Sequence, residues 1–170
     1  MRLLRAILIG CLGAALGGCA GYRLGPSNGL AAGAKSVSIV PFANKTLEPR
    51  LGDAVTGALR KELQRDATFT LATHDAGDVI VSGVVTGYLR EERSLVPNDV
   101  ITARDYRVSL TAQVTARERA TGKVLLDKPV TGYTLMRIGS DLPGGDRQAL
   151  PLLAADLARQ VTSLLADGNW

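Results

Sequence analysis

The fold is decided by the stretch Arg104-Asp105-Tyr106-Arg107-Val108-Ser109-Leu110-Thr111-Ala112-Gln113-Val114-Thr115-Ala116-Arg117. From Tyr106 onward, apolar residues alternate with polar or charged residues up to Arg117. A period of two places successive side chains on opposite faces of a β-strand. The stretch therefore predicts a strand in an antiparallel sheet, with one face buried under another layer and the other face in water.

Two further strands are expected beside this one. The residues Ala120-Thr121-Gly122-Lys123 suit a hairpin loop, and Val124 to Leu135 reads as the returning strand. Pro129 lacks an N–H group, so it should create a bulge or face an open edge. Upstream, the β-branched run from 79 to 89 predicts a strand in which Gly83 and Gly87 mark bulges or close contacts. Residues 90–102 read as a polar loop.

Two helices are expected on the apolar face of this sheet. Apolar residues recur at three- and four-residue spacings across 48–66, and again from residue 150 to residue 165. Proline is tolerated in a first turn, so the second helix should begin near Pro151, with 139–147 as loop. A short strand at 36–42 precedes the first helix. We therefore expect a single α+β domain over 36–170, with two amphipathic helices packed on one face of a mostly antiparallel four- to five-stranded sheet.

The N-terminus has the three parts of a short export signal. Arg2 and Arg5 give a positive start, residues 6–16 are compact and apolar, and small residues lead to Cys19. The apolar part is too short to span a bilayer. The ending Leu16-Gly17-Gly18-Cys19 resembles a bacterial lipobox. We expect residues 1–18 to be cleaved, Cys19 to be the lipid attachment site, and 19–35 to form a lipidated tether. A conventional signal peptide, with Cys19 incidental, is the alternative.

Charge and cysteine content narrow the function classes. The chain has 20 Lys and Arg against 16 Asp and Glu, and removing Arg2 and Arg5 leaves 18 against 16, a net charge of +2. So small an excess does not indicate a nucleic-acid-binding protein. The two cysteines are Cys11, inside the signal, and Cys19, so no disulfide is expected in the mature protein.

No catalytic constellation emerges from the sequence. His74 is the one histidine and lies in a polar turn, where a solvated loop residue is the simplest interpretation. The sequence has no nucleophile elbow, no phosphate-binding loop and no cluster at metal-ligand spacing. We expect a protein that is not an enzyme and has no cofactor, no metal site and no catalytic residues.

Basic residues offer a candidate binding site. If the three long strands form a meander, several arginines gather at one end and Arg117, Arg119 and Lys123 at the other. Either end could hold phosphate groups through charge-assisted hydrogen bonds. Ordinary solvated strand ends with surface ion pairs are the alternative interpretation. The candidate residues are Arg90, Arg93, Arg104 and Arg107.

The order of several short motifs resembles the lipopolysaccharide-assembly lipoprotein family, known as LptE-like. The motifs are Cys19-Ala20-Gly21-Tyr22 after the signal, Val40-Pro41-Phe42-Ala43-Asn44-Lys45-Thr46 at the end of the first strand, Asp78 to Gly83, Tyr106-Arg107-Val108, and Asp156-Leu157-Ala158 in the last helix. Gly77 stands where alanine is common in the family. Each motif is weak alone, and their order carries the resemblance across the mature chain.

The resemblance implies a non-catalytic outer-membrane lipoprotein with two helices against a mostly antiparallel sheet. Such proteins sit in the lumen of the outer-membrane β-barrel translocon that inserts lipopolysaccharide, help the barrel to assemble and handle the lipid. Ala20 after Cys19, in place of aspartate, is typical of transfer to the outer membrane in many Gram-negative bacteria. The implied partners are therefore the barrel, lipopolysaccharide and the membrane, with no nucleic acid.

A second resemblance keeps another function class open. The stretch from Pro41 to Thr46 is also similar to the first strand of periplasmic lipoproteins that activate peptidoglycan synthases or that act in another envelope secretion complex. Those proteins tend to interleave strands and helices. The long strand and hairpin between 104 and 136 favour the lipopolysaccharide translocon.

Overall fold

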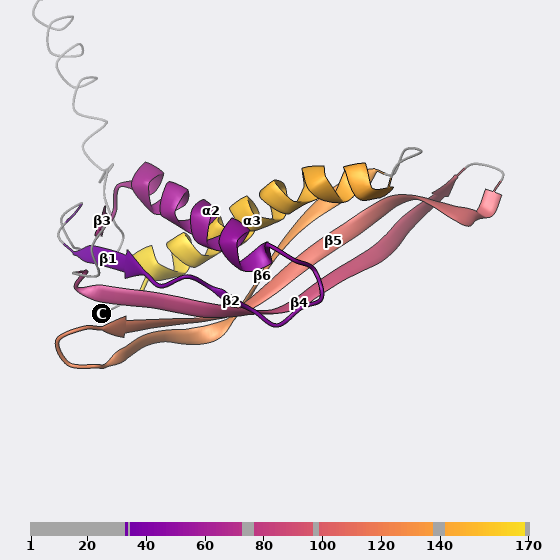
Figure 1. The fold of residues 1–170 in the computed structure, drawn as a ribbon. Helices are drawn as coiled ribbons and strands as arrows, with labels where there is room; N and C mark the ends of the chain where they lie inside the picture. The colour runs from indigo at the N-terminus through magenta and orange to yellow at the C-terminus, as the bar shows by residue number, and fades with distance from the viewer. Residues whose placement is uncertain (1–32, 34, 73–76, 97–98, 138–141, 169–170) are drawn as a thin grey trace, which may run out of the picture.

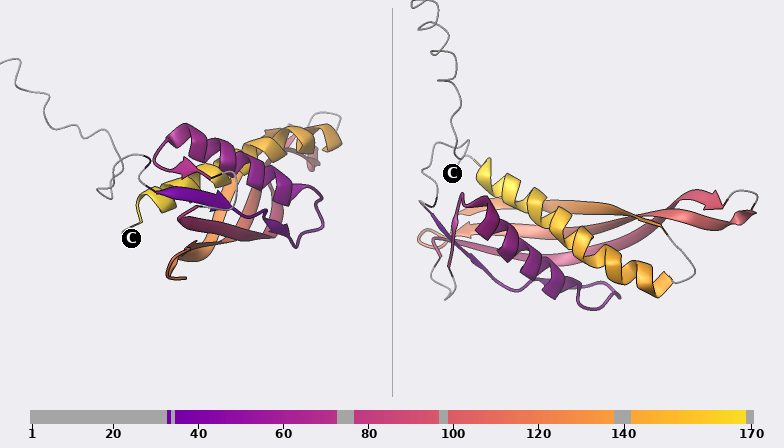
Figure 2. Two further views of the ribbon diagram at one scale, coloured as in Figure 1. Left: turned by 60° about the vertical axis from the view of Figure 1, so that its left-hand side comes forward. Right: turned by 90° about the horizontal axis from the view of Figure 1, so that it is seen from above.

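The protein folds as two helices on one face of a mixed sheet (Figure 1). The computed structural model describes residues 33, 35–72, 77–96, 99–137 and 142–168. In chain order the elements are β1 (Ser36–Ile39), β2 (Ala43–Asn44), α2 (Leu51–Asp66), β3 (Thr70–Leu71), β4 (Val79–Val96), β5 (Asp99–Glu118), β6 (Val124–Arg137) and α3 (Leu142–Ala166). Helices α2 and α3 lie side by side across the sheet (Figure 2). The predicted α+β class with a two-helix layer is confirmed.

The sheet has more strands and more parallel pairing than the sequence predicted. It contains six strands in the order β3-β1-β4-β5-β6, with β2 also paired to β4. Strands β1 and β2 run parallel to β4, and β3 runs parallel to β1, while β4, β5 and β6 form the expected antiparallel meander. The parallel half exists because α2 is a crossover connection. A chain that crosses over a sheet through a helix returns in the same direction.

Strand β5 confirms the alternation from which the fold was predicted. On its inner face, Val108, Leu110, Ala112, Val114 and Ala116 are all buried without measurable exposure. The intervening polar residues of β5 are partly exposed. Buried residues of both helices complete this core, among them Leu51, Val55, Leu59, Leu63, Leu153, Leu157, Val161 and Leu165.

The prediction of a polar loop over 90–102 is wrong. Strand β4 continues to Val96 and β5 begins at Asp99, so the two strands extend beyond the helices as a long hairpin (Figures 1 and 2). Glu91 pairs with Arg107 and Glu92 with Tyr106 in this extension. Backbone pairing and opposite charges across strands stabilise such a ribbon. The run 90–94 is entirely polar or charged, so it lacks the alternation by which strands are recognised in a sequence.

The prediction that the last helix begins near Pro151, after a loop at 139–147, is also wrong. Helix α3 begins at Leu142 and Pro151 lies inside it. Pro143, one residue into α3, occupies the first-turn position that was assigned to Pro151. Proline in a helix interior removes one backbone hydrogen bond. Here Ala149 and Leu153 are buried on either side of the exposed Pro151, so the buried face holds the helix together across the missing bond.

Phe42 joins the first strand, α2 and β4. Its ring, 5% exposed, fills the space beside Gly83, where a Cβ atom would overlap the ring. The backbone N–H of Phe42 donates a 2.9 Å hydrogen bond to Thr56 Oγ1, and that hydroxyl donates to the Gly52 carbonyl at 2.7 Å. Gly52 also approaches so closely that a Cβ atom there would overlap the Phe42 carbonyl. The close contact expected at Gly83 is thereby confirmed.

Asn44 shapes the connection from β2 to α2. Its Nδ2 donates to the Glu48 carbonyl at 2.7 Å, and its Oδ1 accepts bonds from the Thr46 N–H and hydroxyl at 3.0 and 2.8 Å. These are the local side-chain bonds by which asparagine and threonine stabilise turns. The Asn-x-Thr part of the motif therefore closes a turn.

Asp78 fastens the start of β4 to β1. Its Oδ2 accepts bonds from the Ser36 N–H and hydroxyl, both at 2.8 Å, and its own N–H donates to Ser36 Oγ at 2.9 Å. The bonds from Ser36, first from its backbone and then from its hydroxyl, hold the pKa of the Asp78 carboxyl below its usual value of 3.8. The beginning of β4 is thus fixed by the hydrogen bonds of Asp78, just before the strand, and by the steric contact at Gly83.

Helix α3 covers part of the free edge of β6. Asp156 Oδ2 accepts a 3.0 Å hydrogen bond from the Tyr133 N–H, which therefore points away from β5. No register shift separates Tyr133 from Pro129, so the missing N–H of Pro129 also faces the edge, as predicted. A Cβ atom at Gly132 would lie 2.6 Å from the Leu157 nitrogen, so β6 and α3 are in close contact there.

The ionised form of Asp156 is favoured where α3 meets β6. Burial opposes ionisation of this carboxyl. The hydrogen bonds from Tyr133, Arg159 and Gln160, and the charge of Arg159 at 2.7 Å, outweigh burial and hold its pKa below 3.8. The hydrogen-bonded carboxylate of Asp156 therefore stabilises the fold at pH values above its ordinary pKa of 3.8.

Gly83→Ala should destabilise the protein by about 1–3 kcal/mol, because the added methyl group must displace the Phe42 ring from a close-packed core. Gly87→Ala is the matched control on the same strand, since its Cβ atom would lie 3.7 Å from Thr111 Cβ, an ordinary contact. Denaturant unfolding of the two variants measures the difference. Equal stability of the two would contradict the role of Phe42 described above.

Asp156→Asn should lower the free energy of unfolding at neutral pH by about 1 kcal/mol, because a charge-assisted contact becomes a neutral one. The contribution of Asp156 is present above the unfolded pKa of about 3.9 and is lost as the pH falls through the lower folded pKa. The difference between wild type and variant should therefore shrink as the pH is lowered below about 4. Unfolding curves measured across that range test this, and a constant difference at every pH would rule it out.

Candidate functional site

The open face of the sheet, opposite the helices, carries a patch of exposed apolar side chains. Register places Leu89, Ser109 and Tyr133 in one row across β4, β5 and β6, and Glu91, Arg107 and Leu135 in the next row. Leu89, Tyr133 and Leu135 are 56%, 52% and 71% exposed. We call these three residues, with Arg107, the open-face patch. Large apolar side chains gathered on a solvent face mark interaction sites more often than single exposed ones do.

Two arginines give this patch a basic character. The guanidinium of Arg107 lies 4.3 Å from the centre of the Tyr133 ring, a cation–π contact. At the rim, Arg93 forms a 3.4 Å ion pair with Glu91, which lies opposite Arg107. Both side chains of that ion pair are about half exposed, so the pair contributes little to stability and can rearrange around a ligand. The surface therefore combines apolar contact area with two guanidinium groups.

Arg90 lies on the other side of the sheet. It pairs with the buried Val108, so its side chain leaves β4 on the face that the helices cover. Its guanidinium lies 5.1 Å from the centre of the Tyr88 ring and 3.9 Å from Glu48. A hollow of about 290 Å³ lies beside them, next to the fully exposed Leu47. The structure therefore brings Arg93 and Arg107 to one face and Arg90 to the other.

A β-bulge explains this separation. Val81 and Val85 are buried, so their alternation alone would place Arg90 outward and Leu89 inward. The register shifts between Val85 and Gly87, which reverses the faces of the residues that follow. A bulge beside Gly87 was one of the two expectations for that glycine. Leu89, Tyr133 and Leu135 were not among the residues that the sequence predicted to form a site. The alternation of Thr131, Tyr133 and Leu135 with buried Val130, Gly132 and Met136 is the signal that could have found the latter two.

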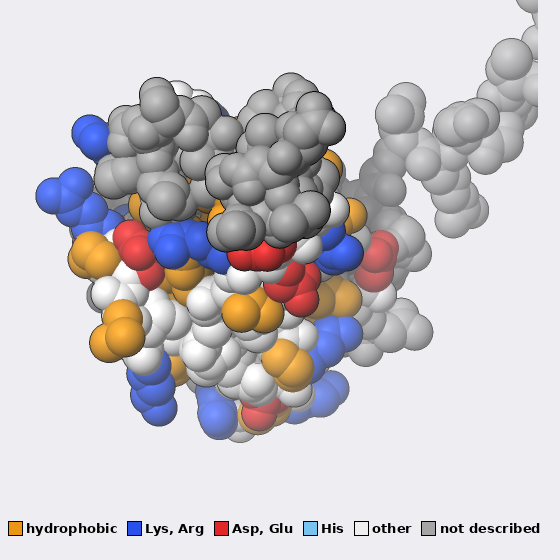
Figure 3. All heavy atoms as spheres, turned by 90° about the vertical axis from the view of Figure 1, so that its right-hand side faces the viewer, with side chains coloured by type: hydrophobic (Ala, Val, Ile, Leu, Met, Phe, Trp, Pro, Cys, Tyr) orange, Lys and Arg blue, Asp and Glu red, His pale blue; other side chains and the backbone are white. Residues whose placement is uncertain are grey.

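Charges of both signs surround the projecting end of the sheet. Figure 3 faces this end and shows basic and acidic side chains mixed with hydrophobic ones. Arg104 belongs to β5, but the structure does not describe its side chain. Cys19, the tether up to residue 32 and His74 lie outside the described residues.

The opposite end of the long strands serves mainly to hold the sheet. Arg119 Nε donates a 2.8 Å hydrogen bond to the Gly77 carbonyl, and its backbone N–H donates to the Asp78 carbonyl at 2.8 Å. A hollow of about 390 Å³ nearby is lined by groups of both charges, including Lys35, Asp78 and Glu118. Arg119 is therefore engaged in fold contacts, and this end offers a less uniform site for an anion than the arginines near the patch.

Neither a metal centre nor a membrane-spanning helix is found in the part of the chain that the structure describes. Within those residues, no three side chains of His, Cys, Asp or Glu approach one another closely enough to hold a metal ion. The described helices include none with the length and apolarity to cross a membrane. The open-face patch and its arginines are thus the strongest candidate for binding.

Several solved structures share this fold. A hypothetical protein, CT253, from Chlamydia trachomatis matches with a TM-score of 0.58 at 10% identity over 82% of this chain and 98% of its own. A minor lipoprotein from Acinetobacter baumannii gives a TM-score of 0.51 at 17% identity, over 78% and 92% of the two chains. PelC from Paraburkholderia phytofirmans, solved as a dodecamer, matches with a TM-score of 0.51 at 19% identity, over 85% of this chain and 95% of its own. At these identities the likeness establishes the fold alone.

The family is shown by a sequence model. No curated protein matches the chain. The family model described as "LptE: Lipopolysaccharide-assembly" matches residues 34–165, which include every described strand and nearly all of α3. The predicted resemblance is thereby confirmed, and the chain belongs to the LptE lipopolysaccharide-assembly family.

Proposed function

We propose that this protein is an outer-membrane lipoprotein, anchored through Cys19, that assists assembly of the β-barrel translocon for lipopolysaccharide. It helps to deliver lipopolysaccharide to the outer leaflet and catalyses no reaction. Membership of the lipopolysaccharide-assembly family supports a role in lipopolysaccharide assembly. The lipobox-like Leu16-Gly17-Gly18-Cys19 supports the anchor. Two or more acyl chains on Cys19 would make membrane attachment stable, where a single chain gives only marginal binding.

The observation that carries this proposal is the composition of the open-face patch. Lipopolysaccharide presents phosphate groups next to acyl chains. Arg93 and Arg107 offer guanidinium groups, which bind phosphate through charge-assisted hydrogen bonds. Leu89, Tyr133 and Leu135 are exposed beside them and offer apolar contact. A surface that serves both parts of an amphiphile supports direct handling of the lipid.

The rest of the open face suits a polar barrel lumen. Thr111 and Thr131 share a 2.8 Å hydrogen bond across β5 and β6, and Gln113 donates to Asp127 at 2.7 Å. The interiors of transmembrane β-barrels are polar, so a polar sheet face can lie against them without burying unpaired groups. This arrangement supports a place in or against the lumen.

Affinity purification of the tagged protein from cross-linked envelopes should recover a large outer-membrane β-barrel, because the proposal requires a stable contact between the two. Cys19→Ala is the control for anchoring: it should lose labelled palmitate and leave the membrane fraction. Recovery of a peptidoglycan synthase in place of the barrel would overturn the translocon assignment and favour the alternative function class. Labelled palmitate that still entered the Cys19→Ala variant would refute the anchor.

Neutralising Arg90, Arg93, Arg104 and Arg107 together should weaken binding of purified lipopolysaccharide by about tenfold or more, equivalent to about 1.4 kcal/mol. Arg107 belongs to the open-face patch and Arg93 lies at its rim, so changing these two to glutamine should account for a larger loss than Arg90→Gln alone. The matched control is Arg117→Gln with Lys123→Gln, which removes two charges at the other end of the strands. Unchanged binding by a folded four-residue variant would exclude these arginines as the site.

A further inference from the structure

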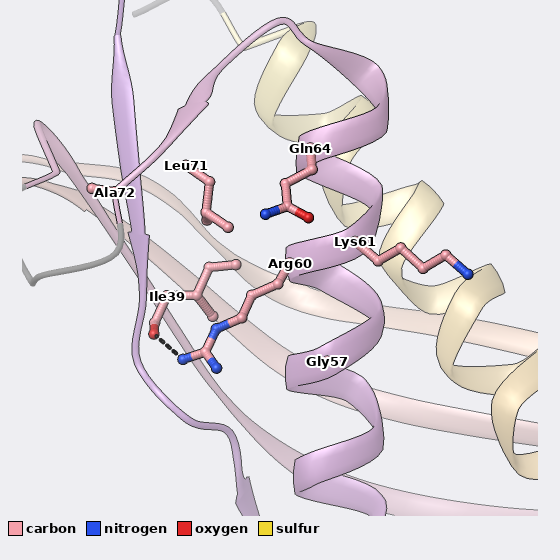
Figure 4. A pocket seen from close by; sticks show the side chains of 7 residues that line it. All are labelled: Ile39, Gly57, Arg60, Lys61, Gln64, Leu71 and Ala72. Carbon is pink, nitrogen blue, oxygen red and sulfur yellow. Dashed lines mark hydrogen bonds between the residues drawn. The ribbon is translucent and has the colours of Figure 1, made fainter.

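A second surface lies on the helix side of the sheet, away from the open-face patch. A hollow of about 450 Å³ separates α2 from the sheet edge formed by β1 and β3, and we call it the edge groove (Figure 4). Its volume is within the range of ligand sites in proteins. Arg60 and Gln64 project from α2 into the groove, toward Ile39 and Leu71, while Lys61 points away from it (Figure 4).

Among the described residues, no strand pairs with β1 beyond Val37 on the side of this groove. Strand β3 covers β1 only as far as the bond from the Ala72 N–H to the Val37 carbonyl, at 2.9 Å. The Val40 N–H donates to the Val81 carbonyl of β4 at 2.9 Å. The Ile39 carbonyl, which belongs to the same peptide unit, therefore points the opposite way, toward the groove. Arg60 Nη2 reaches the Ile39 carbonyl at 3.4 Å, the long end of the hydrogen-bond range. An edge of this kind is a template for an added strand.

Gly57 leaves room for a second backbone. It lies in the interior of α2, where glycine weakens a helix relative to alanine. A Cβ atom built on Gly57 would meet no atom within 4 Å, so no contact in this fold requires glycine there. Gly52, in the same helix, is explained by its close approach to Phe42, whereas Gly57 lies on the rim of the groove. Close approach of another chain is one use for such a glycine.

The polar groups of the groove match an acidic peptide. Arg60 has further N–H groups in a fork that fits a carboxylate. Gln64 carries both a donor and an acceptor, which match the two polar groups of a peptide unit. Among the described residues that line the groove, none is acidic. The apolar side chains of Ile39 and Leu71 would lie beneath such a peptide.

We propose that the edge groove binds an extended, acidic segment of a partner protein, which adds to the open edge of β1. The partner donates a backbone N–H to the Ile39 carbonyl. Its carboxylate side chain pairs with Arg60, and its backbone approaches α2 at Gly57. This surface is separate from the open-face patch, so the two sites can be occupied together.

The test uses the isotope-labelled protein and short peptides blocked at both ends. A peptide of alternating glutamate and valine should cause saturable NMR shifts at the amides of Ile39, Val40 and Gly57. A peptide of alternating lysine and valine should bind about tenfold more weakly or worse. Absence of shifts with the acidic peptide would overturn the proposal. Equal shifts with free glutarate would also overturn it, since they would indicate a site for small anions.

Matched variants separate binding from folding. Arg60→Glu should weaken binding of the acidic peptide about tenfold, while Arg65→Glu, the same charge change on α2 away from the groove, should leave it within about twofold. Gly57→Leu should block binding by filling the rim. Gly57→Ala should raise the melting temperature and retain most of the binding, because its added methyl group is small. Binding that survives both Arg60→Glu and Gly57→Leu in folded protein would place the peptide elsewhere.

Discussion

The packing of Phe42 against Gly83 is the contact on which the rest of this structure depends. Strand β1 pairs with β4 before Phe42, β2 pairs with β4 after it, and α2 begins only a few residues later. At this one residue the ring fixes the chain to β4, and the backbone N–H fixes it to α2 through Thr56. Without the bond to Thr56, the break between β1 and β2 would leave a buried N–H without a partner, which is costly in a core. The crossover geometry of α2, and with it the parallel half of the sheet, follows from this junction.

The residues that identify the family are largely the residues that build the fold. Phe42 fills the core, Asn44 and Thr46 close a turn, Asp78 ties β4 to β1, Gly83 receives the Phe42 ring, and Asp156 holds the edge of β6. These positions tolerate few other residues for steric and hydrogen-bonding reasons. A motif composed of such positions identifies an architecture. The chemistry that contacts a lipid or a partner must therefore be sought on surfaces outside the motifs, such as the open-face patch and the edge groove.

The sequence was sufficient to predict the antiparallel core and the helix layer because both depend on local periodicity. The alternation in β5 predicted which side chains are buried, and the absence of an N–H on Pro129 predicted a bulge or an open edge, of which the edge is observed. The parallel pairing of β1 could not be read in the same way, since it depends on where the crossover helix returns the chain. The hairpin extension begins with a run of polar and charged residues after Leu89, so periodicity does not reveal it. The start of α3 was misplaced because a first turn suits either Pro143 or Pro151, and the sequence pattern alone does not distinguish them.

The positions of Arg90 and Arg107 show how a single inserted residue changes what a sequence implies. Side-chain alternation along β4 would have grouped Arg90 with Arg107, and the bulge at Gly87 separates them. The same shift turns Leu89 out of the core and adds it to the open face, across Ser109 from Tyr133, where the alternation of β6 already exposes Tyr133 and Leu135. Bulges are common where a sheet must re-aim side chains for a purpose other than stability. Exposure of Leu89 gains nothing for the isolated fold. The bulge therefore explains why Leu89 and Arg90 occupy faces opposite to those that simple alternation along β4 predicts.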